Sequence, residues 1–445
     1  MNADDEQDSA PRQDPLRPRL STFRQLLLSF YWFSVNTMWS AVLIITMPSQ
    51  IKSAVGDATK GSVLGLALAV GAFLSMIAAP VFGGLSDRIR LPGGRRAPWI
   101  VIGTIGTMAG LLGLAYLIKP GHPESVVGWT IAFLVVELFS NVATGPYSAL
   151  IPDLVPADQR GSASGWLGLM TMLGTFAGGV MGFLIGPLGY QGVYFIVIAV
   201  MFLGAVVTVL GVKERELPRD TSPFKIGAFL KGLYEPFRHS DFAWVFFTRL
   251  LVTMGIFTVQ EFIQYYLGDV IGAPFVLAGL GKVADTAESA VSFFLPALLL
   301  GAIITTLVAG VLSDRYGRKP MVYLSGALMG VVCLVFILVQ NFTVAVLMGI
   351  VFGLGYGAYE SVDWALASDV LPSTNDYAKD MGVWHVAMVL PQVIATPVAG
   401  LLLDRFQSVG ASRSIPHLGY TVIFLVAVVY FLFGSLFVKQ IKKVR

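Results

Sequence analysis

Twelve long apolar stretches alternate with short polar segments along the chain. Each is about 20 residues or longer, which is the length an α-helix needs to cross the hydrocarbon core of a bilayer. Such runs are too long for barrel strands, and a helix satisfies its own backbone polar groups in lipid. The pattern predicts an all-α membrane protein with twelve transmembrane helices, at about 25–48, 61–85, 98–118, 129–152, 163–186, 192–212, 242–266, 289–312, 320–340, 343–371, 381–403 and 418–438.

Composition supports this fold class. Of the 445 residues, 55% are hydrophobic and only 13% are charged, and the mean hydropathy is +0.74. A soluble protein keeps about a quarter of its residues charged, so this surface is suited to lipid. The only cysteine, Cys333, excludes an intramolecular disulfide. Neither basic tracts nor basic residues interleaved with aromatic ones indicate a nucleic-acid partner.

The distribution of Lys and Arg predicts the orientation. An even number of helices places both termini and alternate loops on one side, and that side holds 23 basic residues. The opposite loops hold six, and Arg249 lies inside the seventh stretch. Because positive loops stay in the cytoplasm, we expect a multi-pass protein of the inner cell membrane with both termini cytoplasmic.

The chain is built from two similar halves. GGLSDR at 83–88 matches GVLSDR at 310–315, and ALIPDLVP at 149–156 matches ALASDVLP at 365–372. Two matches in the same order indicate an internal duplication, as in transporters made of parallel repeats. The expected organisation is a cytoplasmic tail at 1–24, six helices at 25–212, a cytoplasmic central loop at 213–241, six helices at 242–438 and a tail at 439–445.

The repeated loops resemble the loop signature of the major facilitator superfamily. The second copy carries Gly310, Leu312, Ser313, Asp314, Arg315, Gly317, Arg318 and Lys319, whereas the first copy has a longer spacer before Arg95 and Arg96. A narrower similarity lies in GGRRAPW at 93–99 and GPYSALIPDL at 145–154. These segments are similar to the sucrose–proton symporters and the related glycoside–pentoside–hexuronide transporters. That group often has Arg where this chain has Ser148.

The superfamily resemblance implies a central cavity lined by the first and fourth helices of each half. Polar side chains independently follow one helical face at 129–152, with Glu137, Asn141, Thr144 and Ser148 spaced by four, three and four residues. A polar stripe facing lipid is costly, although small polar residues also join neighbouring helices. The candidate substrate-binding residues are Asn36, Trp39, Glu137, Asn141, Tyr147, Gln260, Gln264, Tyr356 and Trp364.

Three carboxylates are candidates for proton coupling. Glu360 and Asp363 lie one helical turn apart in the tenth stretch, 343–371. The first, fourth and tenth stretches contain no Lys or Arg. Two close carboxylates in a low dielectric resist double ionisation, so one should hold a proton near neutral pH. A cation bound by oxygen ligands is the alternative. The resemblance to the sucrose symporters adds Asp153.

The loop signatures are expected to act as gates where the halves meet. They contribute Asp87, Arg88, Arg95, Arg96, Asp314, Arg315, Arg318 and Lys319. A purely topological role for their positive charges is the alternative. Asp153 is also expected to form a salt bridge with Arg160 in the loop that follows it.

These features favour secondary transport without enzymatic activity. Neither a phosphate-binding loop nor a Cys/His cluster with metal spacing is present in the sequence, so we expect no cofactor or metal. The leading hypothesis is a monomeric proton symporter for a small polar solute such as a sugar or glycoside, working by alternating access in the lipid bilayer. The alternatives are a proton-coupled exporter of amphipathic compounds or lipids, and a receptor or scaffold that transports nothing.

Overall fold

The structure is a computed structural model that describes residues 19–89, 91–156, 159–211, 235–370 and 377–442, without the side chains of some residues in these ranges. Twelve α-helices of at least 18 residues lie in this part of the chain. The first half contains α1 (Thr22–Trp39), α3 (Lys60–Arg88), α4 (Ala97–Tyr116), α5 (Ser125–Ser148), α7 (Arg160–Gly179) and α8 (Gly182–Gly211). The second half contains α10 (Ser240–Gln260), α12 (Ala287–Tyr316), α13 (Arg318–Leu338), α14 (Phe342–Val370), α15 (Tyr377–Ser412) and α16 (Leu418–Phe437).

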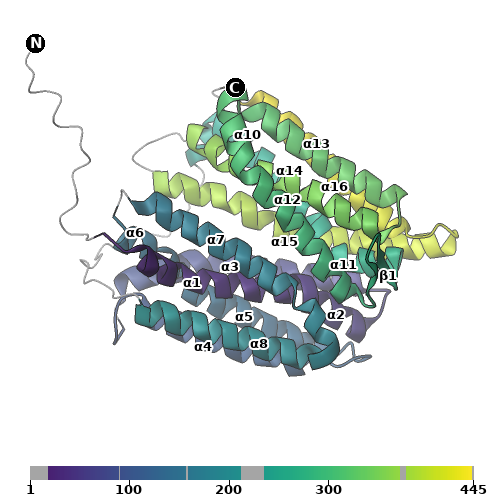
Figure 1. Ribbon diagram of the computed structural model, residues 1–445, viewed down its shortest axis with the longest axis horizontal. Helices are drawn as coiled ribbons and strands as arrows, with labels where there is room; N and C mark the ends of the chain where they lie inside the picture. Colours follow the sequence, from purple (N-terminus) through teal and green to yellow (C-terminus); the bar gives the residue numbers. More distant parts are fainter. Residues whose placement is uncertain (1–18, 90, 157–158, 212–234, 371–376, 443–445) are drawn as a thin grey trace, which may run out of the picture.

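Figure 1 shows the two halves side by side, the first in purple to teal and the second in green to yellow. Shorter elements connect or extend the long helices. They are η1 (Ser40–Thr46), α2 (Met47–Val55), α6 (Leu150–Leu154), η3 (Glu235–Arg238), α11 (Ile263–Tyr266), η4 (Leu267–Ile271), β1 (Phe275–Leu277), β2 (Gly281–Ala284) and η5 (Val438–Gln440). The antiparallel β1–β2 hairpin was not predicted from the sequence.

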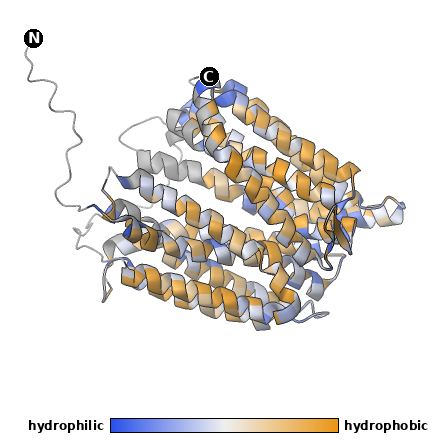
Figure 2. Ribbon diagram, in the orientation of Figure 1, coloured by the Kyte–Doolittle hydropathy of each residue, from blue (hydrophilic) through white to orange (hydrophobic). Residues whose placement is uncertain are grey.

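The outer surface of the bundle is apolar, as lipid contact requires. Leu210 and Leu338 are 81% and 80% exposed, and hydrophobic residues cover the outer helices in Figure 2. Eleven of the long helices are apolar enough to cross a membrane. The remaining one, α7, is rich in glycine. Together they form the predicted twelve-helix membrane fold.

The first helix of each half departs from regular α-helical geometry. In the first half α1 runs into the π-helical segment η1 before α2. In the second half α10 stops at Glu261, and α11 then runs into the π-helical segment η4. Such segments are uncommon and frequently occur at functional sites. The sequence predicted continuous helices here, because hydrophobic periodicity does not register a local change in hydrogen-bond spacing.

The boundary between the fifth and sixth helices also differs from the prediction. The expected fifth span, 163–186, ends inside α8, because α7 already stops at Gly179. Gly189 has φ +67° and bends α8. A left-handed φ of this kind suits glycine, which has no Cβ to clash. The apolar run continues through both breaks, so hydropathy alone could not locate them.

Two packing seams join the halves. Helix α3 packs against α15, and α12 packs against α7 and α8. The first seam is made of small residues: a Cβ added at Gly65 would lie 2.3 Å from the carbonyl oxygen of Thr396, and one at Gly400 only 2.0 Å from that of Gly61. Glycines let helices approach closely in a membrane. The hydrogen bonds and ion pairs described between the halves lie toward the end carrying α2, η4 and the hairpin, which we call the closed end.

Candidate functional site

A buried polar cluster lies between α3 and α5 in the first half. Asn141 donates hydrogen bonds from Nδ2 to Ser75 Oγ at 2.9 Å and to the Glu137 carbonyl oxygen at 2.8 Å. Glu137 is 8% exposed and Asn141 is 7% exposed. Among the described ion pairs, none involves the Glu137 carboxylate. The cluster therefore places a carboxyl and an amide one turn apart between α3 and α5, and their binding of a polar ligand stays a prediction.

The other two members of that stripe have local partners. Thr144 Oγ1 donates to the Ser140 carbonyl oxygen at 2.9 Å, and Ser148 Oγ donates to the Gly145 carbonyl oxygen at 2.7 Å. These are hydrogen bonds within the helix, the ordinary way for a hydroxyl to be satisfied in lipid. Ser75, which completes the cluster from α3, was not found from the sequence, because a single serine on a helix carries no positional signal.

Aromatic side chains pack beside the polar cluster. Trp39 meets Phe133 edge to face at 6.5 Å between ring centroids, and Asn36 donates from Nδ2 to the Trp32 carbonyl oxygen. Tyr147 stacks on Trp32 and donates its hydroxyl to the Leu28 carbonyl oxygen at 2.7 Å. Tyr147 thus joins α5 to α1 through a bond that is already formed. Its predicted contact with substrate could use the ring but not a free hydroxyl.

The second half contains a buried ion pair. The Arg249 guanidinium on α10 contacts the Asp363 carboxylate on α14, with side chains 1% and 0% exposed. Tyr359 donates its hydroxyl to Asp363 Oδ1 at 3.2 Å. The expectation that Asp363 lacks a nearby cation was wrong, since Arg249 supplies one from the seventh helix. Of the two neighbouring carboxylates, Glu360 is the one without an ion-pair partner among the described side chains.

The closed end is fastened by a polar cluster of five side chains from both halves, which we call the ionic latch. Lys52 Nζ lies 2.6 Å from Asp269 Oδ1, and Lys60 contacts both Asp57 and Asp269. Tyr420 donates to Asp269 as well. Burial alone would raise the pKa of Asp269, but Lys60 and Lys52 outweigh it and lower that pKa below its ordinary value.

Further contacts surround the ionic latch. Gln264 donates from Nε2 to the Ile45 carbonyl oxygen at 3.1 Å and to Ser49 Oγ at 2.8 Å. Tyr265 donates to the Pro48 carbonyl oxygen, and Glu288 accepts from Ser49 and Tyr190. Gln264, predicted as a substrate contact, therefore lies in the seam between the halves. The sequence did not predict these contacts, because it could not pair loops from different halves.

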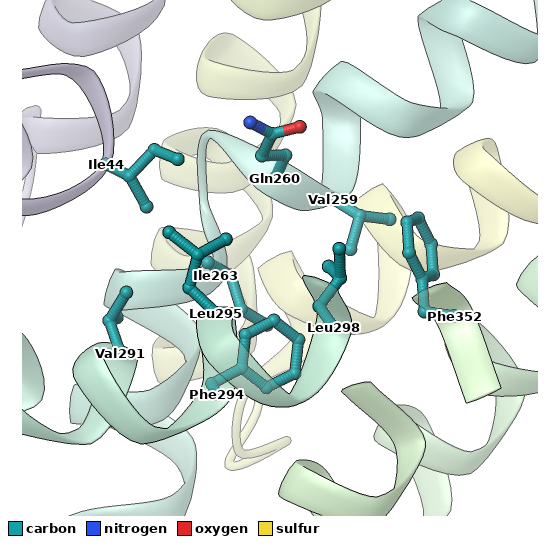
Figure 3. Close-up of a pocket in the computed structure, with 9 residues that line it drawn as sticks. All are labelled: Ile44, Val259, Gln260, Ile263, Val291, Phe294, Leu295, Leu298 and Phe352. Carbon is teal, nitrogen blue, oxygen red and sulfur yellow. The ribbon is translucent and has the colours of Figure 1, made fainter. Parts of the chain in front are cut away.

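A mostly apolar cavity lies between the halves, just inside the closed end. Figure 3 shows Ile44 from η1 facing a wall of the second half, with Gln260 as the only polar lining residue. The remaining lining residues are Val259, Ile263, Val291, Phe294, Leu295, Leu298 and Phe352. The accessible volume of the cavity, about 10 Å³, is the size of one water molecule, so a ligand contact for Gln260 stays a prediction.

The repeated loop signatures form matching contacts within each half. Arg96 pairs with Asp153, with Nη2 at 3.0 Å from Oδ2, and also donates to Ser86. Arg318 likewise donates to Ser313 Oγ at 2.7 Å. Asp153 therefore pairs with Arg96, and more distantly with Arg95, whereas the side chain of its predicted partner Arg160 lies outside the described residues. The matched Arg–Ser contacts support the internal duplication.

Several predicted site residues cannot be placed in detail. The side chains of Asp87, Arg88, Asp314 and Trp364 lie outside the described residues. Tyr356 and Glu360 are partly buried on α14, whereas Arg315 and Lys319 flank the α12–α13 connection. Their gating, binding and coupling roles stay predictions.

Two six-helix bundles, joined at one end around buried polar clusters, define the class of the protein as a multi-pass membrane transporter of the major facilitator fold. The sequence profile described as MFS/sugar transport protein matches residues 58–437. The chain therefore belongs to the MFS/sugar transport protein family.

Curated relatives in the superfamily have different cargoes. The chain is 24% identical over 394 residues to the sucrose transport protein SUC4 of Arabidopsis thaliana, covering 74% of this chain and 75% of that one. It is 26% identical over 294 residues to the class B tetracycline resistance protein of Escherichia coli, covering 65% and 67%. The crystal structure of the nucleoside transporter NupG matches with a TM-score of 0.70 at 14% identity, covering 94% and 99%. These matches establish the fold and family, and leave the cargo to be inferred.

Proposed function

We propose that this chain is a proton-coupled symporter for a small polar solute, with a sugar or glycoside as the leading class. The observation that carries the proposal is the Glu137–Asn141–Ser75 cluster, in which the Asn141 amide bonds Ser75 across α5 and α3 one turn from the buried Glu137 carboxyl. Sugars are bound by such groups together with aromatic faces, and Trp39 and Trp32 lie on the adjoining α1. The similarity to a sucrose transport protein supports the same substrate class.

Glu360 is the proposed site of coupling. The neighbouring Asp363 is held by Arg249, which favours its ionised form. Glu360 lies one turn away on α14 without an ion-pair partner among the described side chains, so it is the carboxyl of the two that is left to exchange a proton. Asp153 becomes the weaker candidate because Arg96 neutralises it. Neutralising a cavity carboxyl makes movement through the membrane less costly.

Transport would follow alternating access. The halves rock about the central site, with the ionic latch closing one end and the repeated loop signatures gating the other. The loops at the end opposite the closed end contain the excess of Lys and Arg. Because positive loops stay inside the cell, this excess supports a cytoplasmic position for that end and for both termini, in a cell with an inner membrane. The structure would then represent the state closed to the outside.

Binding and transport can be tested separately. Purified chain is screened by thermal shift against sugars, glycosides, drugs and lysolipids, because a specific ligand stabilises the folded state. Counterflow in proteoliposomes then measures exchange of the best ligand, and an imposed pH gradient measures accumulation. We expect Glu137→Gln to weaken binding by about tenfold, the loss of one charge-assisted hydrogen bond. Glu360→Gln should keep counterflow and lose accumulation.

Two results would contradict this proposal. If no sugar or glycoside shifts the melting temperature while an amphipathic drug does, the substrate class is wrong. If Glu360→Gln still accumulates substrate against its gradient, coupling lies elsewhere.

An exporter of amphipathic compounds is the second candidate. The apolar lining between the halves in Figure 3 favours it only if the small cavity widens in another state, since eight of its nine lining side chains are apolar. The similarity to a tetracycline resistance protein supports the same candidate function. The drug and lysolipid arms of the thermal-shift screen discriminate the two candidates, and proton-driven efflux from inside-out vesicles would establish export.

A further inference from the structure

Glu261 is a buried carboxyl that the proposed binding and coupling sites do not use. It is 2% exposed and lies at the interruption between α10 and α11. Its described side-chain hydrogen bond is to Gln392 on α15. The second carboxyl oxygen, Oε2, is buried without a hydrogen-bond partner. A buried polar atom without a partner is costly.

One helical turn further on, Gln264 presents a second buried acceptor without a donor. Its amide nitrogen is fixed by the bonds to Ile45 and Ser49 of the first half. That orientation leaves Gln264 Oε1 buried and unsatisfied. Two buried oxygen acceptors on adjacent turns therefore lack donors. A proton on the carboxyl converts an acceptor into a donor, which an ionised carboxylate cannot provide.

The surrounding elements supply no cation to Glu261 among the described residues. Toward the closed end, Glu288 on α12 bonds Ser49, Asp404 on α15 accepts from the Gly61 and Ser62 amides, and Tyr420 on α16 bonds Asp269. The lysines of the first half, Lys52 and Lys60, are held by Asp269 and Asp57. On α10, Arg249 pairs with Asp363, and Asp241 lies at the far end of the helix. On α11, Tyr265 and Tyr266 donate to the carbonyl oxygens of Pro48 and Phe336. The other described titratable or charged side chains on the packed helices are Arg315 and Tyr316 on α12, Tyr356, Tyr359 and Glu360 on α14, Arg405 on α15 and Tyr430 on α16.

Glu261 is also connected to two of the contacts between the halves. Gln264, on the adjacent turn, reaches α2 and η1 directly. On the other side Gln392 is one turn from Thr396, which donates to the Gly65 carbonyl oxygen on α3. Separation of the halves at the closed end would break both connections and admit water. The carboxyl would then be solvated and would release its proton more readily.

We propose that Glu261 is a proton-binding site whose protonation stabilises the closed end. The site takes a single proton from the side to which this end opens, and losing that proton favours the open state. The proposal rests on the transport function above and adds a second titrating carboxyl to it, remote from Glu360. By linkage, a ligand that binds one state better shifts the population toward that state. Closure is therefore favoured at low pH and lost as pH rises.

The test measures the gap across the closed end without substrate. Spin labels at Glu124→Cys, just before α5, and Lys282→Cys, on β2, occupy exposed positions in the two halves. They report distances in the full chain with Cys333→Ser. We expect the long-distance population to grow as pH rises. Glu261→Gln, which mimics the protonated form, should stay closed across the range. Asp241→Asn, at the opposite end of α10 where Asp241 accepts from the Lys442 amide, should keep the parent's midpoint.

Three outcomes would overturn the proposal. The first is a parent protein whose label distances do not respond to pH. The second is a Glu261→Gln variant that keeps the parent's midpoint. The third is a closed end that opens when sodium is replaced by choline but not when the pH changes. If Glu261→Gln does not fold, Glu261→Asp takes its place, because it keeps a titrating group. The midpoint of the pH response must then move, and an unmoved midpoint would also contradict the proposal. None of these readouts uses substrate, so failure of the symport proposal is recognised separately by the ligand screen and counterflow.

Discussion

Removing Asp269 from the ionic latch should open the closed end. Asp269 is the shared partner of Lys52, Lys60 and Tyr420. In Asp269→Asn the ammonium of Lys60, whose side chain is 4% exposed, would keep only the exposed Asp57. Breaking a buried pair by removing one partner costs about 3–5 kcal/mol. The lower value applies here because Asp269 retains 17% exposure.

A loss of about 3 kcal/mol changes the ratio of closed to open states by about 100-fold. Accessibility of Thr396→Cys measures that ratio, because Thr396 is fully buried against α3 and becomes reachable by a maleimide only when the halves part. Cys333 is replaced by Ser in every variant. We expect the labelling rate to rise up to about 100-fold in Asp269→Asn, less if the latch already opens frequently.

Asp57→Asn is the matched control in the same latch. The Asp57 side chain is 75% exposed, and an exposed ion pair contributes at most about 1 kcal/mol, so labelling should rise less than about fivefold. Equal rates in the two variants would refute the assignment of Asp269 as the centre of the latch. The pKa of Asp269 is lowered while the end is closed. Its stabilisation of the closed state is therefore present above the ordinary aspartate pKa and is lost as pH falls through the lowered pKa.

The remaining predictions concern topology, the buried ion pair and the loop gates. Reporters fused at residue 225 and after Arg445 should both read cytoplasmic, and an external reading at either site contradicts the orientation. Asp363→Asn should destabilise the fold by about 3–5 kcal/mol by leaving Arg249 without its carboxylate, whereas a paired Arg249→Met change should recover part of that loss in a denaturation series. Asp87→Asn and Asp314→Asn should slow counterflow more than they weaken equilibrium binding of substrate. If either change abolished binding and left the ratio of open to closed states unchanged, the gating role would be contradicted.

The helix count, the two halves and the α5 stripe could be predicted because each leaves a periodic trace in the sequence. Glu137 and Asn141 are one turn apart on a helix that otherwise reads as apolar, and this pattern requires an inward face. The ends of α7 and α8 could not be predicted, since glycine breaks within an apolar run leave its hydropathy unchanged.

Contacts between distant segments were beyond the sequence. Arg249 is a single basic residue in an apolar stretch, and its pairing with Asp363 depends on how α10 and α14 are rotated toward each other. The ionic latch is a similar case: Lys52, Lys60 and Asp269 are far apart in the chain and each resembles an ordinary loop charge. Physical reasoning identified the cost of burying such charges but not the partner that offsets it.

The glycine seam between α3 and α15 brings the backbones of the two halves into direct contact. Gly61, Gly65 and Gly400 let backbone meet backbone, and the side chains of Thr396 and Asp404 bond backbone groups of α3 across the seam. Most of the described polar bonds between the halves lie at one rim of the bundle, around Asp269 and Gln264. Substitutions at that rim could therefore retune the turnover of the transporter over generations without disturbing the packed framework.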